Sequence, residues 1–129
     1  MDIIKVIVAG TRTFNDYELL KAELNIRIVP GAFNRTVEIV SGCANGADTL
    51  GEKYANEYGF LIKKFPADWD KYGKKAGYIR NNEMAKYATH CVVFWDGKSK
   101  GTEMMIKLAK ENGLITQAVI YNSQVPYYL

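Results

Sequence analysis

The sequence predicts an α/β protein, a Rossmann-like three-layer sandwich with a mainly parallel sheet of about five strands. Two observations predict this fold class. Short runs of β-branched and other apolar residues alternate with segments whose apolar residues recur at helical spacing. Each run is also followed by enough residues for the crossover helix that a parallel strand pair requires. Strands and helices that alternate in this way form a parallel sheet with helices on both faces.

The N-terminal half supplies three strands and two helices. Residues 3–9 (IIKVIVA) are mostly β-branched and end at Gly10, as is typical of a buried strand that stops at a tight turn. Residues 15–27 place apolar side chains at spacings of three and four, which predicts an amphipathic helix. The other elements predicted here are a strand at 36–40 (TVEIV), a helix at about 47–58 that ends at Gly59, and a strand at 60–65 (FLIKKF).

The C-terminal half begins with a long connection, residues 66–78. It holds a proline, two glycines and three aromatic residues, which is more than a crossover requires, and such loops often carry function. The elements predicted after it are a helix at about 79–88, a strand at 90–95 (HCVVFW), a helix from DGKSKGTEM to about Gly113, and a strand at 114–121 (LITQAVIY).

Composition narrows the class of protein. The chain has 129 residues, of which 48% are hydrophobic, so we expect one domain over residues 1–129. The net charge of +3 is too small to indicate a nucleic-acid partner by itself, but it suits an anionic small ligand. Cys43 and Cys91 lack zinc-type spacing, so we expect reduced thiols, no metal and no cofactor. Neither a leader peptide nor an apolar run of ~20 residues is present, so we expect a cytoplasmic protein without a membrane partner.

Three loops are expected to meet at one edge of the sheet. In the commonest order for such sheets, the first strand is central, the second and third lie on one side, and the fourth and fifth lie on the other. The chain reverses direction beside the first strand, and ligands bind in the crevice formed there. The loops after the first, second and fourth strands are GTRTF (10–14), SGCANGAD (41–48) and DGKSKGTE (96–103).

These loops combine residue types that suit an anion. Glycine has no β-carbon, so backbone N–H groups can approach a ligand closely. Two predicted helices begin in the loops and direct their free N–H groups and positive dipole ends to the same place. Hydroxyls and guanidinium groups add further donors, and phosphate is the expected anion. The residues concerned are Gly42, Gly46 and Gly101, Ser99 and Thr102, and Arg12 and Arg80.

Each of these features also has a purely structural explanation. Ser99 is equally suited to cap a helix, and the glycines are equally suited to form turns. Asp48 is placed either to accept hydrogen bonds from ribose hydroxyls or to favour the positive end of a helix in its first turn. In the long connection, Trp69 and Tyr72 could stack on a base or cover the core. The sequence leaves these alternatives open.

Four blocks taken together resemble a known family. In order, and over roughly residues 3–121, they are GTRTF, SGCANGAD, FPADWDKYGKKAGYIRNNEM and FWDGKSKGTEMMIKLA. They are similar to the YspA/YpsA-related (DUF2493) branch of the SLOG superfamily, whose relatives include the LOG lysine decarboxylase-like proteins and the DNA-processing protein DprA. The resemblance implies a Rossmann-like fold that binds nucleotides or nucleotide-derived ligands. It implies a pocket formed by Gly10, Arg12, Ser41, Gly42, Gly46, Asp48, Arg80, Asn81, Ser99, Gly101 and Thr102.

The chain departs from the LOG enzymes at an informative position. LOG enzymes split a nucleoside monophosphate into base and ribose phosphate, and the final glutamate of their PGGxGTxxE pattern takes part in the reaction. Met105 stands at that place here. Glu103 comes two residues earlier, and on a helix that shift turns a side chain by about 200°. The second loop also has Cys43, Ala44 and Asn45 where relatives often carry a glycine and an arginine.

We therefore expect a protein that binds or senses a nucleotide or nucleotide derivative, because the loops suit an anion and the LOG glutamate is absent. The alternative is a hydrolase of a nucleotide N-glycosidic bond, in which Arg80 orients the phosphate and Glu103, Asp48 or Asp68 assists departure of the base. A homodimer is plausible. DNA binding in the manner of DprA is less favoured, and a nucleic-acid partner is not expected. That hypothesis depends on Lys63, Lys64, Lys71, Lys74 and Lys75, a group more often found on a solvated face.

Overall fold

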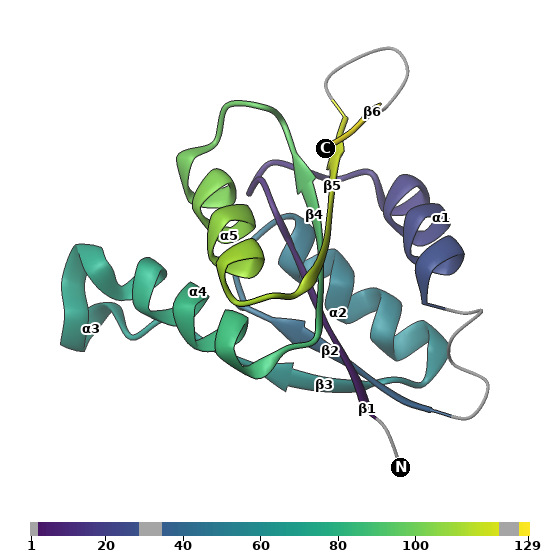
Figure 1. Cartoon of the computed structure of the whole chain (residues 1–129), viewed down its shortest axis with the longest axis horizontal. Coiled ribbons are helices and arrows are strands. Elements are labelled where there is room, and N and C mark those ends of the chain that lie inside the picture. The colour runs from purple at the N-terminus through teal and green to yellow at the C-terminus, as the bar shows by residue number, and fades with distance from the viewer. Residues whose placement is uncertain (1–2, 29–34, 122–126) are drawn as a thin grey trace.

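The computed structural model describes residues 3–28, 35–121 and 127–129, and it confirms the α/β class. A six-stranded sheet has the order β3-β2-β1-β4-β5-β6 (Figure 1). β1 to β5 pair in parallel, and β6 pairs antiparallel with β5. The strands are β1 (Ile3–Gly10), β2 (Thr36–Ser41), β3 (Leu61–Lys64), β4 (His90–Trp95), β5 (Ile115–Ile120) and β6 (Tyr127–Tyr128).

The order predicted for the first five strands is confirmed, with β1 between β2 and β4. Each of these strands lies within about one residue of its predicted bounds at either end, which is the usual accuracy of such boundaries. The sequence does not predict β6, because two residues carry no periodicity. β6 exists only through its pairing with β5, in which Ile120 lies opposite Tyr127.

The helices agree with the prediction except in the long connection. Residues 66–78 are not one loop, because they contain a short helix, a 3-10 turn and the first residues of α4. Asp68 begins the short helix by accepting a hydrogen bond from Lys71 N–H at 3.1 Å. The helices are α1 (Tyr17–Arg27), α2 (Ala47–Tyr58), α3 (Trp69–Tyr72), η2 (Gly73–Lys75), α4 (Ala76–Tyr87) and α5 (Lys100–Glu111).

Two apolar cores lie on opposite faces of the sheet. Alternate residues of β1 point to opposite faces, so Val6 and Val8 join one core while Ile7 joins the other. α1 and α2 cover the first face, and α4 and α5 cover the second (Figure 1). This is the predicted three-layer sandwich. In the described ranges, no helix has the length and apolar character needed to cross a membrane.

Close backbone packing sets the geometry at the carboxyl end of β1. Gly10 lies opposite Phe94 of β4, and a β-carbon at Gly10 would stand only 2.2 Å from the Phe94 carbonyl oxygen. On α2, a β-carbon at Gly51 would stand 2.8 Å from the Val8 side chain. These two glycines let β4 and α2 approach β1 closely, and the loops that follow β1 and β4 and precede α2 are drawn together.

Candidate anion-binding site

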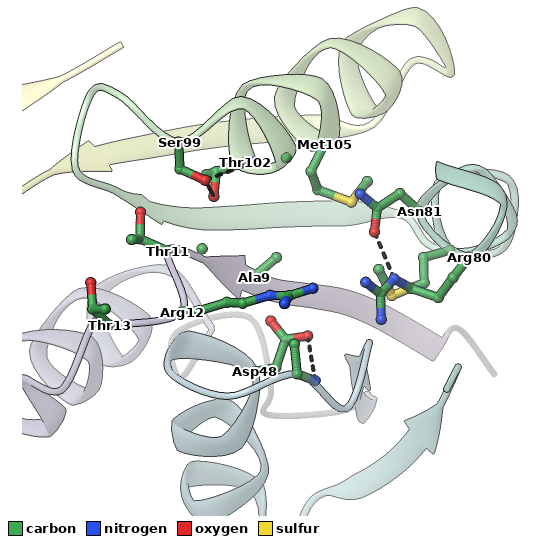
Figure 2. Close-up of a pocket in the computed structure, with 14 residues that line it drawn as sticks. Ala9, Thr11, Arg12, Thr13, Asp48, Arg80, Asn81, Ser99, Thr102 and Met105 are labelled. Carbon is green, nitrogen blue, oxygen red and sulfur yellow. Dashed lines mark hydrogen bonds between the residues drawn. The ribbon is translucent and has the colours of Figure 1, made fainter. Parts of the chain in front are cut away.

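A cleft lies at the carboxyl ends of β1 and β4, between α2 and α5, and we call it cleft 1 (Figure 2). It encloses about 360 Å³, within the range of roughly 300–1,000 Å³ found for ligand pockets. The loops after β1, β2 and β4 all contribute to its wall, together with α4. The predicted site residues that line cleft 1 are Gly10, Arg12, Asp48, Arg80, Asn81, Ser99, Gly101 and Thr102.

The loop after β1 is anchored at both ends. Thr11 N–H donates to the Phe94 carbonyl at 2.9 Å, and the Thr11 hydroxyl oxygen accepts from Asp96 N–H at 3.1 Å. Phe14 is buried and stacks on Phe94 with ring centroids 5.0 Å apart. The residues between Thr11 and Phe14 are exposed. The backbone on both sides of Arg12 is therefore held in place, and the Arg12 side chain projects from it.

Arg12 extends from this loop across cleft 1, above Asp48 and toward Arg80 (Figure 2). Its guanidinium makes no hydrogen bond or ion pair with any residue of the described ranges. Arg80 carries the second guanidinium of the cleft and, unlike Arg12, is buried. An arginine held over a cleft with its five N–H donors unused is available to a ligand.

The loop before α5 is ordered by Asp96. Its carboxylate accepts from Lys98 N–H and Ser99 N–H, each at 2.8 Å. Hydrogen bonds from these backbone groups, Ser99 first, hold the pKa of Asp96 below its ordinary value. Ser99 caps α5, and its hydroxyl oxygen accepts from the Thr102 hydroxyl at 3.2 Å. The structural role considered for Ser99 is therefore present, and its own O–H has no acceptor among the residues that the structure describes, so it can donate to a ligand in the cleft.

Arg80 and Asp48 form the floor of cleft 1 and are tied to the second loop. One terminal nitrogen of Arg80 donates to the Gly42 carbonyl, and its Nε donates to Asn81 Oδ1 at 2.8 Å. Asp48 Oδ2 accepts from Ala44 N–H at 3.2 Å. A β-carbon at Gly42 would stand 2.8 Å from both Arg80 Nη1 and Asp48 Oδ2. Glycine at this position lets the two charged groups reach the loop backbone.

Burial dominates the electrostatics of these two side chains. Asp48 is only 5% exposed, and desolvation raises its pKa to about 6 although Ala44 N–H and Arg80 act in the opposite direction. Desolvation likewise lowers the pKa of Arg80, although the Asp48 carboxylate opposes that shift. For both groups the loss of water outweighs their mutual attraction, as is common for charges buried together. An added anion would balance the positive charge of the buried Arg80 guanidinium.

We expect Asp48→Asn to stabilise the protein at neutral pH. A carboxyl whose folded-state pKa is about 6 holds its proton between pH ~4 and ~6 after the unfolded chain has lost it. Its favourable contribution is therefore complete below pH ~4 and is lost as the pH rises through ~6. Asparagine, which is never ionised, should raise the free energy of unfolding by about 1–3 kcal/mol at pH ~7.5 and change it little at pH ~4.

Urea unfolding at the two pH values measures this effect. Asp96→Asn is the control of opposite sign, because backbone hydrogen bonds lower the pKa of that carboxyl. It should therefore destabilise the protein at neutral pH. Lower stability of Asp48→Asn at neutral pH would contradict the expectation, because it would mean that the ionised carboxylate is a net stabiliser.

A second cleft, cleft 2, adjoins the first and encloses about 290 Å³. The two clefts share Arg12, Ala44 and Arg80, so they meet at these three residues. Of the predicted site residues, Gly42 lines cleft 2 and not cleft 1. The exposed Cys43 and Trp69 of α3 also line cleft 2.

Two predicted site residues, Ser41 and Gly46, line neither cleft. Ser41 is fully buried, and its hydroxyl donates to Glu52 Oε2 at 2.6 Å. Gly46 caps α2 with φ +80°, and a β-carbon there would stand 2.4 Å from the Thr11 carbonyl oxygen. Both residues therefore have a structural role in the second loop, and Gly46 allows that loop to pack closely against the loop that carries Arg12.

The chain matches the model of the "YspA, cpYpsA-related SLOG family" over residues 4–72, which is more than half of its length. It belongs to this SLOG family. It is also 31% identical over 116 residues to "Gene 61 protein" of Mycobacterium phage D29, covering 85% of this chain and 91% of the phage protein. No solved structure was found to match the chain.

The family assignment confirms the resemblance inferred from the four sequence blocks. The SLOG match contains the first two blocks and ends within the third. Arg12, Asp48 and the second loop lie inside it, whereas Arg80 and the α5 end of cleft 1 lie beyond it. The family match therefore covers one part of the site, and the fold brings Arg80 and the start of α5 to that part.

The three carboxylates considered as acid or base lie in different places in this SLOG protein. Asp48 lines cleft 1. Asp68 is exposed, caps α3 and lines neither cleft. Glu103 is exposed on the outer face of α5 beside Lys107, whereas Met105 is buried and lines cleft 1. The position of the LOG glutamate thus faces the cleft, and a thioether occupies it.

Other lining residues are absent from the sequence-based set. The hydroxyls of Thr11 and Thr13 lie in the same GTRTF loop as Arg12, so hydroxyl content alone could have indicated them. Met84 of α4 and Ala9 of β1 could not be indicated, because they resemble core residues in the sequence. Both are almost fully buried and form part of the apolar lining at the base of the cleft.

Proposed function

We propose that this protein binds a nucleotide or nucleotide derivative, with the phosphate held in cleft 1. The observation that carries the proposal is the guanidinium of Arg12, which has no partner in the part of the chain that the structure describes and extends over a cleft already lined by Arg80. Two cations face a single carboxylate there, Asp48, whose pKa is raised to about 6. An anion would balance this excess of positive charge.

The shape of cleft 1 supports a phosphate in particular. The first turns of α2 and α5 meet at its rim, and the N–H groups of a first turn lack acceptors within their own helix. The free O–H of Ser99 stands at the second of these helix ends. Planar guanidinium forks, helix N-termini and a hydroxyl together match the several oxygens of a phosphate group. Membership of the SLOG family supports a nucleotide as the carrier of that phosphate.

Thermal unfolding with added ligands tests the proposal. AMP, GMP, CMP, UMP and ADP-ribose are the probes, and adenosine is the matched control without phosphate. A ligand present at ~100 times its Kd should stabilise the protein by about 2.7 kcal/mol, which raises Tm by several degrees. Stabilisation by adenosine equal to that by AMP, or no stabilisation by any of the phosphates, would reject a phosphate site in cleft 1.

One observation favours hydrolysis of the N-glycosidic bond as a second candidate. Asp48 is a carboxyl in cleft 1 with a pKa of about 6, and such a value suits proton transfer near neutral pH. Against this candidate, Met105 stands where LOG enzymes have their glutamate. Chromatography after incubation with the same nucleotides separates the two candidates: the binding protein releases no free base. A hydrolase would release base, and Asp48→Asn would stop the release.

A further inference from the structure

Cleft 2 has the composition of a subsite for an aromatic group attached to an anion. Arg12 and Arg80 line it as they line cleft 1, and no aspartate or glutamate is among its described lining residues. Trp69 also lines it, and this residue is 50% exposed and belongs to neither apolar core. Trp69 therefore presents a large aromatic surface to cleft 2 beside the two arginines, where a planar group could stack on it.

The position of Trp69 is fixed by the short helix that carries it. Asp68 caps α3 through Lys71 N–H at 3.1 Å, and Tyr72 N–H donates to the Asp68 carbonyl at 3.0 Å. The ring lies over Gly77 of α4: a β-carbon there would stand 3.5 Å from Trp69 Cη2 and 3.9 Å from Arg80 Nη2. The indole and the buried guanidinium thus flank one point on α4. A planar group in cleft 2 would meet both.

The two clefts are of a size to act together. Cleft 1 encloses about 360 Å³ and cleft 2 about 290 Å³, each near the lower end of the roughly 300–1,000 Å³ range of ligand pockets. Because the two arginines are common to both, one ligand can keep its negative charge at the arginines and extend into each cleft.

We propose that cleft 2 binds the base of the nucleotide, stacked on Trp69, while the phosphate lies in cleft 1. This inference rests on the proposed function and adds the orientation of the ligand to it. Base stacking on an aromatic side chain tolerates different bases, because every base has a π face. Phosphate contacts in cleft 1 then provide charge recognition, and the face of Trp69 provides recognition of the base.

The test compares Trp69→Ala with the wild type by calorimetric titration of AMP, GMP, CMP and UMP, and of ribose 5-phosphate as the ligand without a base. Trp69→Ala should weaken the tightest nucleotide by about 10- to 100-fold and leave ribose 5-phosphate unchanged. Trp69→Phe should retain most of the affinity, because it keeps an aromatic face. Tyr72→Ala is the matched control, because Tyr72 is an exposed aromatic residue of the same helix that lines neither cleft.

The thiol of Cys43 provides an independent measurement. Cys43 is exposed and lines cleft 2, whereas Cys91 is fully buried, so iodoacetamide should label the folded protein at Cys43. A nucleotide whose base occupies cleft 2 should slow this labelling, and ribose 5-phosphate should not.

The possible failures are distinguishable. Unchanged nucleotide affinity in Trp69→Ala would place the base elsewhere and leave the proposed function intact. Equal weakening of nucleotide and ribose 5-phosphate would also overturn the inference, because Trp69 would then support the whole site. Absence of binding of every probe to the wild type would overturn both the inference and the proposed function.

Discussion

Arg80→Ala should lower the affinity for a phosphate-bearing nucleotide by about 100-fold or more, because truncating one partner of a buried charge pair typically costs roughly 2–5 kcal/mol. Arg80 lines both clefts and holds the second loop through the Gly42 carbonyl. The substitution removes a cation, leaves the Gly42 carbonyl without its donor, and takes away a positive charge that favours the ionised Asp48 carboxylate. Isothermal titration of the variant with the nucleotide that binds the wild type most tightly measures the loss.

Arg12→Ala is the comparison that separates the loss of ligand binding expected in Arg80→Ala from its loss of fold stability. The Arg12 guanidinium has no hydrogen bond or ion pair with the described residues, so its removal should weaken nucleotide binding and leave the urea midpoint unchanged. Arg80→Ala should change both. Nucleotide binding by Arg80→Ala at the affinity of the wild type would mean that the ligand lies outside clefts 1 and 2.

Gly46→Ala should destabilise the fold by about 3 kcal/mol or more, because two separate penalties combine. Gly46 has φ +80° and ψ −126°, a conformation that L side chains rarely adopt. A β-carbon would also stand 2.4 Å from the Thr11 carbonyl oxygen, and that backbone is pinned to Phe94 by a hydrogen bond of 2.9 Å. The urea midpoint of the variant measures the loss.

Gly101→Ala is the matched control for Gly46→Ala. Gly101 lies in the first turn of α5, and a β-carbon there would meet no atom within 4 Å. Alanine is the better helix former, so this variant should be as stable as the wild type or more stable by up to ~1 kcal/mol. Equal stability of Gly46→Ala and the wild type would show that the second loop does not need its observed backbone conformation.

The comparison of these two glycines shows where sequence reasoning stops. Both stand in predicted loops at the start of a predicted helix, and both suit close approach of a phosphate to the backbone. The structure separates them, because Gly46 faces the Thr11 carbonyl across the fold and Gly101 faces open space. The distinction depends on a contact between Thr11 and Gly46, which are 35 positions apart in the chain, so the residues next to Gly46 cannot predict it.

The long connection gives a second example. Aromatic and glycine residues between 66 and 78 predict a loop, but α3, η2 and the start of α4 occupy most of it. Short helices carry little periodicity, and their stability comes from caps such as Asp68 and from packing against neighbours. The sequence nevertheless indicates that this segment is unusual, and it is the segment that carries Trp69 to cleft 2.

The amino-acid sequence by itself determined the alternation of strands and helices, the order of the five parallel strands, and the three loops at the carboxyl end of the sheet. The alternation follows from periodicity, which is a local property, and the strand order is the commonest one for sheets built from such right-handed crossovers. Only the tertiary structure decided which side chains of those loops face a cleft. Arg12 has no hydrogen-bond or ion-pair partner among the described residues, Ser41 is hydrogen-bonded to Glu52, and Glu103 is exposed. Burial and hydrogen-bond partners come from elements that are distant in the chain.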